Sequence, residues 1–94
     1  MIVQIVRFKS GMSEEDVLRR SEERAPRFRA LPGLLQKYYL KYAPDEYGAV
    51  YVWDSRESLA AFRESELFRT IPEAYAFDCA PAVTVADVFM PLRK

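Results

Sequence analysis

Apolar side chains gather in four short segments of this chain. Residues 2–8 (IVQIVRF), 34–42 (LLQKYYLKY), 48–53 (GAVYVW) and 83–90 (VTVADVFM) are rich in β-branched and aromatic residues, which favour strands. Residues 43–47 (APDEY) separate the second segment from the third and predict a turn. The pattern therefore predicts four strands, with a hairpin formed by the middle two.

The segment between the first two strands predicts a helix. Ser13 is a candidate N-cap, and Asp16 follows three residues later as in a capping box. Pro26 is expected to kink or shorten the last turns, and Pro32-Gly33 ends the helical region. The predicted inner face of this helix contains Val17, Leu18, Ser21, Ala25 and Phe28.

A second helix is predicted to begin at Asp54 or Ser55 and to be broken by Pro72. A loop over residues 74–81 then leads to the last strand. The predicted inner face of the second helix contains Leu59, Phe62 and either Leu67 or Phe68. The order β-α-β-β-α-β predicts one α+β domain over residues 1–94, a ferredoxin-like sandwich with a four-stranded antiparallel sheet.

The predicted strands are apolar on both faces. Val6 and Ile5 point to opposite sides of the first strand, and Trp53 and Val52 do the same in the third. Two helices cover only one face of such a sheet, so the other face would leave a larger apolar patch than monomers usually expose. We therefore expect a homodimer that forms through this sheet face.

Composition removes several functional classes. The 14 basic and 14 acidic residues balance, so no net charge recruits nucleic acid or an anionic membrane. No apolar run approaches the ~20 residues of a membrane span, and the first residues do not resemble a signal peptide. The single Cys79 excludes an internal disulfide and agrees with a reducing cytosol, so we expect a cytoplasmic protein.

The chain has no histidine. This excludes His-ligated haem, His-rich metal sites and a Ser-His or Cys-His nucleophile pair, and we expect no metal site. RNA-recognition modules share the predicted element order, but EYGAVYVW misses several positions of their K/R-G-F/Y-G/A-F-V-x-F/Y pattern. We therefore expect no nucleic-acid partner.

Three residues are the main candidates for chemistry. Gln4, Tyr51 and Trp53 have the strand parity to share one face and could line an apolar cavity that binds a small molecule. The candidates for its remaining walls are Phe28, Phe62, Phe68 and Tyr38. The alternative is that Tyr51 and Trp53 simply fill the core. Gln4 favours the cavity, because a buried amide needs hydrogen-bond partners that tyrosine hydroxyls or a ligand could supply.

Other polar residues allow two interpretations each. Asp87 lies inside an apolar strand and is either a base with a raised pKa, or an exposed edge residue or a carboxylate paired with an arginine. Arg24, Arg27 and Arg69 either bind a substrate acid or belong to a solvated helix face. Tyr39 and Tyr42 are expected to serve packing or an interface.

Several motifs together resemble a known superfamily. The segments APRFRALPGLLQKYYL and GAVYVWDSRESLAAF, with the first strand and the helix start, are similar to the dimeric α+β barrel proteins. Within them the chain is most similar to YdhR-type mono-oxygenases, near the antibiotic-biosynthesis monooxygenases. The resemblance implies a ferredoxin-like protomer that pairs through its sheet into an α+β barrel.

The resemblance also implies a chemistry. Cofactor-independent monooxygenases of this superfamily oxidise electron-rich polycyclic phenols, and the deprotonated substrate itself reduces O2. By position, Trp53 resembles their pocket tryptophan and Gln4 lies near their pocket amide. Haem-degrading relatives use a histidine in the second helix, where this chain has SELFRTIPEA, so haem degradation is not expected.

The sequence thus leads to two hypotheses. The first is a cofactor-independent monooxygenase for a small aromatic or quinol-type substrate, in which Trp53 and Tyr38 orient the ring and Gln4 or Tyr51 stabilises an oxyanion. The second is a non-catalytic homodimer that binds a small ligand or only assembles. A cavity of several hundred Å³ near Trp53 would favour a binding site, and a filled core would favour assembly alone.

Overall fold

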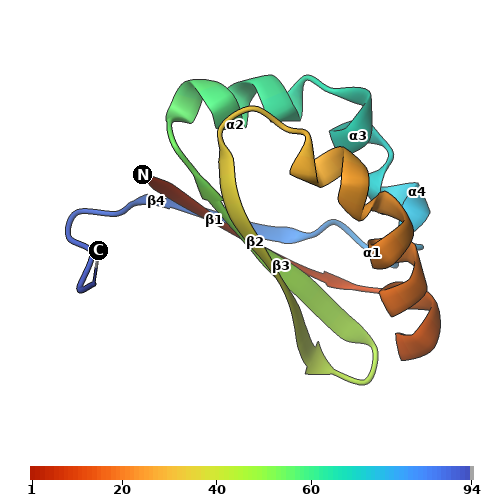
Figure 1. Ribbon diagram of the computed structural model, residues 1–94. Helices are drawn as coiled ribbons and strands as arrows, with labels where there is room; N and C mark the ends of the chain where they lie inside the picture. The colour runs from red at the N-terminus through yellow and green to blue at the C-terminus, as the bar shows by residue number, and fades with distance from the viewer. Residues whose placement is uncertain (94) are drawn as a thin grey trace.

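A computed structural model describes residues 1–93 of the chain. Its elements follow the order β1 (Ile2–Lys9), α1 (Glu14–Arg29), β2 (Leu34–Ala43), β3 (Glu46–Trp53), α2 (Arg56–Arg63), α3 (Glu66–Arg69), α4 (Ile71–Ala74) and β4 (Ala82–Asp87). The four strands form one antiparallel sheet in the order β2-β3-β1-β4. All four helices lie on the same face of this sheet (Figure 1), which confirms the ferredoxin-like prediction.

Helix boundaries follow local capping signals. The Ser13 hydroxyl accepts a hydrogen bond from the Asp16 amide at 3.2 Å and starts α1, and the Ser55 hydroxyl accepts one from the Ser58 amide at 3.2 Å and starts α2. Each bond satisfies a backbone donor that the first helical turn leaves free. None of the helices in residues 1–93 is long and apolar enough to cross a membrane.

The second predicted helix is three short helices in the structure. Ser65 has extended backbone angles, and its hydroxyl accepts a hydrogen bond from the Phe68 amide, so it ends one helix and caps the next. Pro72 lies in the first turn of α4, where its missing N–H is not needed. The prediction that Pro72 breaks a helix is therefore wrong.

Smaller differences concern α1 and two strands. Helix α1 continues through Pro26 to Arg29, and Leu18, which was assigned to its inner face, is exposed. Strand β3 begins at Glu46, inside the predicted turn, and β4 ends at Asp87, three residues earlier than predicted.

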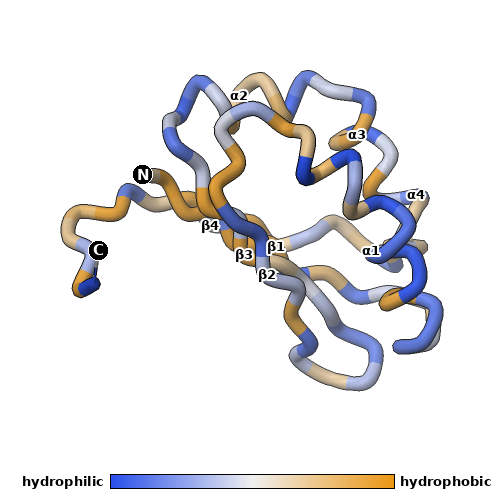
Figure 2. Tube along the Cα trace, in the orientation of Figure 1, coloured by the Kyte–Doolittle hydropathy of each residue, from blue (hydrophilic) through white to orange (hydrophobic). Residues whose placement is uncertain are grey.

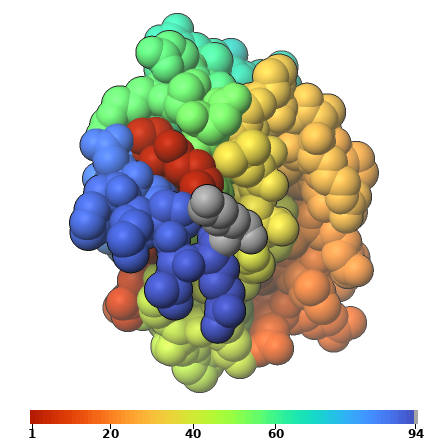
Figure 3. Space-filling model, turned by 60° about the vertical axis from the view of Figure 1, so that its left-hand side comes forward, coloured from red at the N-terminus to blue at the C-terminus, as the bar shows by residue number. Residues whose placement is uncertain are grey.

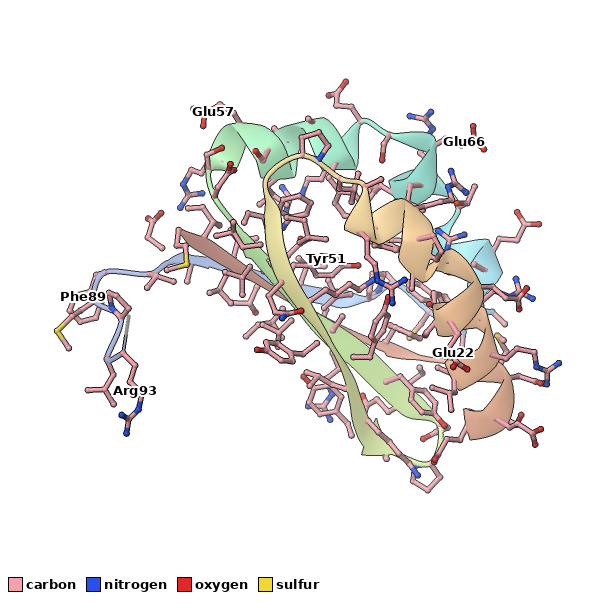
Figure 4. The ribbon with its side chains drawn as sticks, viewed as in Figure 1. Glu22, Tyr51, Glu57, Glu66, Phe89 and Arg93 are labelled. Carbon is pink, nitrogen blue, oxygen red and sulfur yellow. The ribbon has the colours of Figure 1, made fainter. Side chains whose placement is uncertain are left out.

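The residues after β4 leave the sheet. In Figures 1 and 4 the segment with Phe89 and Arg93 extends away from the helices and the sheet, and Phe89 is 97% exposed. Its start remains attached, because the Val88 amide donates to the Met1 carbonyl at 2.9 Å. Figure 3 accordingly shows the first residues of β1 beside this terminal segment.

Strand register separates the two faces of the sheet. The pairs Gln4↔Tyr51 and Ile2↔Trp53 face the helices, whereas Ile5↔Val50 faces away from them. Figure 2 shows apolar segments in β1, β3 and β4, a partly hydrophilic β2, and an α1 that is largely hydrophilic along its length. The outer face therefore exposes apolar side chains that the helices do not cover, among them Ile5, Tyr38 and Tyr42.

The core between sheet and helices consists of two clusters. One contains Trp53, Tyr51 and Phe62 with their neighbours, and the other is built around Phe8 and Tyr75. The half-buried Val6 and Ile71 pack against both clusters. The space that the two clusters leave between them is the candidate site.

Candidate functional site

A cavity of about 440 Å³ lies between the sheet and the helices. This volume is within the roughly 300–1,000 Å³ of small-molecule sites. Its walls are mostly apolar and come from both core clusters; they include Gln4, Val6, Phe8, Lys37, Ala49, Tyr51, Phe62, Phe68, Ile71, Tyr75 and Phe77. The core is therefore not filled at this place.

Gln4 and Trp53 form one buried unit. Trp53 is 0% exposed, Gln4 is 2% exposed, and the Trp53 Nε1 donates to the Gln4 Oε1 at 3.0 Å. The indole nitrogen can only donate, so this bond fixes which end of the amide is oxygen. The Gln4 NH2 group is therefore the end that remains for a ligand in the cavity, which Gln4 lines.

Tyr51 extends this unit along β3. Its ring stacks on Trp53 with centroids 6.1 Å apart and planes 4° apart, and it also contacts Phe62. Figure 4 shows Tyr51 between the sheet and the helices. Burial raises the pKa of the Tyr51 phenol above its ordinary value, so the hydroxyl keeps its proton at neutral pH and can donate a hydrogen bond.

Lys37 is a polar residue of the cavity wall that is not among the candidates from the sequence. It pairs with Tyr51 across β2 and β3, and its side chain is largely buried. The Nζ atom lies 3.4 Å from the ring centroid of Phe28, 4.4 Å from that of Tyr39 and 4.6 Å from that of Tyr51. Burial, followed by the charge of Arg24, lowers the pKa of the Lys37 amine to about 7.

A second polar group lies at the α1 side. The Ser21 hydroxyl donates to the Val17 carbonyl at 2.9 Å and lies 2.9 Å from the Tyr75 hydroxyl. Because the hydroxyl proton of Ser21 is used in this way, Tyr75 donates to Ser21. Burial raises the pKa of the Tyr75 phenol.

Arg24 connects α1 to α3. Its Nη2 atom donates to the Leu67 carbonyl at 2.9 Å and to the Thr70 hydroxyl at 3.2 Å. Burial lowers the pKa of the Arg24 guanidinium, and its Nε is the one buried side-chain nitrogen or oxygen in residues 1–93 without a hydrogen-bond partner. Arg24 is therefore a link between helices, not part of a solvated helix face.

The predicted site residues separate into three groups. Gln4, Tyr51, Phe62 and Phe68 line the cavity as expected. Trp53 and Phe28 lie in the core behind it, where Trp53 holds Gln4 and Phe28 contacts Lys37. The prediction that Tyr38 contributes to this wall is wrong, because Tyr38 pairs with Val50 on the outer face and is 57% exposed.

The candidate base Asp87 is an exposed carboxylate paired with an arginine. Its Oδ2 lies 3.0 Å from the Arg56 Nη2, and it is absent from the cavity wall. The alternative in which Asp87 is paired with an arginine is therefore the correct one.

The sequence contains only part of the signal for Lys37. Lys37 and Tyr39 share strand parity, and a lysine on the helix-facing side of a strand is an unusual position for a charged residue. The strand is irregular between Leu34 and Gln36, where the register shifts. Counting from Leu34 therefore places Lys37 on the wrong face, because sequence parity does not reveal a bulge.

Comparisons with known proteins agree with this architecture. A family model described as antibiotic biosynthesis monooxygenase matches residues 1–74. No protein of curated function matches the chain in sequence.

Solved structures share the fold at low sequence identity. SnoaB of Streptomyces nogalater, described as a cofactor-independent oxygenase, is 14% identical with a TM-score of 0.80, over 99% of this chain and 97% of its own. Rv0793 of Mycobacterium tuberculosis is 18% identical with a TM-score of 0.77, over 97% of each chain. NE2512 of Nitrosomonas europaea, of unknown function, is 14% identical with a TM-score of 0.79, over 96% of this chain and 90% of its own.

Proposed function

The chain belongs to the antibiotic biosynthesis monooxygenase family, and from this we propose that it oxidises a small aromatic phenol with O2 and without a cofactor. The observation that supports this most is the cavity of about 440 Å³, whose apolar walls carry only a few polar groups. Such a lining suits a compact fused-ring molecule that needs two or three directed hydrogen bonds.

The proposed reaction needs no external reductant. A phenol with a hydrogen on the carbon opposite its hydroxyl, or the ketone tautomer with a CH2 there, loses four electrons and becomes a quinone. O2 gains these four electrons: one of its atoms becomes the new carbonyl oxygen and the other leaves as water. The neutral substrate is a poor electron donor, so the step that the protein must promote is formation of the substrate anion.

Gln4 and Tyr51 are proposed to stabilise this anion. The Gln4 NH2 group and the Tyr51 hydroxyl are donors held in place by Trp53 through a hydrogen bond and a ring contact. Donors fixed in a dry cavity stabilise developing negative charge without reorganisation, and removal of one such donor typically costs about 3 kcal/mol of barrier. Phe62 and Phe68 are proposed to contact the substrate ring.

The protein is further proposed to act as a homodimer. The outer face of the sheet exposes Ile5, Tyr38 and Tyr42, and no helix covers this face in Figure 1. A second copy would bury this apolar surface sheet against sheet. The cavity lies on the other face, so each protomer would carry its own site.

The test is O2 uptake with a panel of anthrones and fused-ring phenols. We expect the wild type to consume O2 above the buffer rate. Ala49→Leu, which adds bulk to the cavity wall, should lower the rate at least about tenfold, whereas Ala60→Leu on the exposed face of α2 should not. An O2 uptake by the wild type equal to buffer across the panel would exclude the oxygenase proposal.

The same panel tests the non-catalytic alternative. Trp53 stacks on Tyr51 of the cavity wall, so its fluorescence should respond to a bound aromatic ligand. Ligand binding by the wild type without O2 uptake would identify a small-molecule binding protein.

A further inference from the structure

The surroundings of Lys37 contain no partner for a charged amine. None of the cavity-lining residues in the described part of the chain is an aspartate or glutamate. The five ion pairs within residues 1–93 use other side chains; for example, Lys41, on the same strand as Lys37, pairs with Glu14 of α1. Glu57 and Glu66 point away from the sheet in Figure 4.

Three aromatic rings, and not a carboxylate, surround the Lys37 amine. Phe28, Tyr39 and Tyr51 lie within 4.6 Å of the Lys37 Nζ, measured to their ring centroids. Ring faces attract an ammonium, but less than water or a carboxylate does. Packing therefore holds the amine in place, and no carboxylate prevents it from losing its proton.

The remaining charges at the cavity are positive. Arg63 and Arg69 line it, and Arg24 lowers the pKa of Lys37 through its charge. The wall of this apolar cavity thus contains three cationic residues, Lys37, Arg63 and Arg69, and no anionic residue among those described, in a chain with no net charge. This arrangement is complementary to an anionic ligand.

We propose that the Lys37 amine is the base that ionises the substrate in this cavity, and that the resulting ammonium is the counter-ion of the substrate anion. The proposal rests on the oxygenase function and names its catalytic base. It also defines the substrate class: a fused-ring phenol or its ketone tautomer, acidic enough for an amine to deprotonate.

The proton and the electrons balance over one turnover. Lys37 Nζ takes the O–H or C–H proton, and the bonding pair stays on the substrate. The anion passes one electron to O2, and the resulting substrate radical and superoxide combine to form a C–O bond. The ammonium returns its proton to the distal oxygen, which gives a hydroperoxide. The remaining hydrogen on that carbon then leaves as a proton while the O–O bond breaks, and the departing hydroxide takes up a proton, so the products are the quinone and water.

The acidity of Lys37 fits this cycle. A base works best when its pKa lies near the working pH, and burial together with Arg24 brings that of Lys37 to about 7. The titratable groups that face it are Arg24 from α1, Tyr39 from β2 and Tyr51 from β3, and Tyr75 after α4 lies near Tyr39 and Tyr51. Burial raises the pKa of each of these three tyrosines, so Lys37 is the group among them that titrates near neutrality.

A purely structural lysine is the competing explanation. In that case the amine would stay charged and only fill the space between the three rings. The pH dependence of turnover separates the two explanations. Ionisation of a bound phenol tests whether the side chain at position 37 stabilises the substrate anion.

The first experiment measures ionisation without oxidation. The probe is 4-nitrophenol, whose anion absorbs visible light and whose neutral form does not. The variants are Lys37→Met, Lys37→Arg and, as control, Lys41→Met on the same strand outside this cavity. We expect bound nitrophenol to have an apparent pKa at least about one unit lower in the wild type, Lys37→Arg and Lys41→Met than in Lys37→Met.

The second experiment measures O2 uptake with an anthrone between pH 5 and pH 10. The wild-type rate should rise through pH ~7. Lys37→Met and Lys37→Arg should lose about 100-fold or more at pH 7, since arginine keeps its proton. The O2-uptake rate of Lys37→Arg should recover at high pH, because the substrate then ionises in solution and its anion binds beside the arginine.

The outcomes keep the two proposals apart. Nitrophenol ionisation that is equal in the wild type and Lys37→Met overturns the role of Lys37, whatever the O2 result. Shifted nitrophenol ionisation without O2 uptake removes the oxygenase function and leaves a lysine that ionises phenols. A wild-type pH profile retained in Lys37→Arg also overturns the base. Circular dichroism of each variant shows whether it is folded.

Discussion

Burial of Lys37 has a cost as well as a role. Its pKa of about 7 in the folded protein lies below the value of about 10.4 expected in the unfolded chain. Between these two values the unfolded state binds more protons than the folded state, so the free energy of unfolding rises with pH. Below pH ~7 the full cost of burying Lys37 lowers the free energy of unfolding, because the amine is then charged in the folded protein.

Lys37→Met should therefore stabilise the protein at low pH. We expect roughly 2 kcal/mol at pH 6, after allowing for the attraction between the ammonium and the three rings. The gain should shrink as the pH approaches 10. Urea unfolding at pH 6 and pH 9 measures both values, with Lys41→Met as the exposed control. Equal stability of Lys37→Met and wild type at pH 6 would contradict the burial of a charged amine.

Trp53 holds Gln4 in place but does not itself line the cavity. Trp53→Phe removes the Nε1 donor and leaves the Gln4 Oε1 unpaired beside a smaller ring. We expect a loss of about 2–3 kcal/mol from the unpaired oxygen and the lost volume. The pH profile of O2 uptake should keep its midpoint, because Lys37 is untouched. A shifted midpoint would place Trp53 in the acid–base step.

The link between β2 and α2 depends on one glycine. Gly33 has a φ of +82°, and a Cβ there would lie 2.1 Å from the Ser58 hydroxyl and 2.5 Å from the Asp54 carboxylate. Both groups belong to the capping network that starts α2. The backbone is also joined here, since the Asp54 amide donates to the Gly33 carbonyl at 2.8 Å.

Gly33→Ala should destabilise the protein by about 2–4 kcal/mol through strain and displacement of this cap. Gly11→Ala is the matched control, because its Cβ would meet nothing closer than 3.6 Å and its φ is ordinary. Thermal unfolding followed by circular dichroism compares the two. A Gly33→Ala midpoint within 1–2 °C of the Gly11→Ala midpoint would show that the loop relaxes freely.

Elements with strong local signals could be predicted from the sequence. The Ser13 cap and the β-branched residues of β1 determine their structures within a few residues. The division of the second helix could not be predicted, because Ser65 caps only when the chain turns there, and that turn depends on packing over the sheet. The role of Lys37 depends on the bulge near Leu35 and on rings from three different elements.

The whole molecule has one sheet with two apolar faces, and only one of them is covered by helices (Figure 1). A charge in the middle of the uncovered face should prevent the proposed dimer, because it would be buried without a partner. Ile5 is suitable, since it lies on the central strand β1 and points outward.

Ile5→Asp should convert a dimer into a monomer, which light scattering at low micromolar concentration can measure. Leu18→Asp places the same charge on the exposed face of α1 and should leave the dimer intact. A monomeric wild type, or a dimeric Ile5→Asp, would exclude assembly through this face.

Alternation along β3 gives a practical rule for redesign. Tyr47, Ala49 and Tyr51 line the cavity, whereas Val50 and Val52 point to the opposite face. A combinatorial library that varies only these three cavity-lining positions would search for new ligands without altering the face of the proposed dimer. A library at Val50 and Val52 would instead select for new subunit pairings in the proposed dimer, including heterodimers, because neither residue lines the cavity.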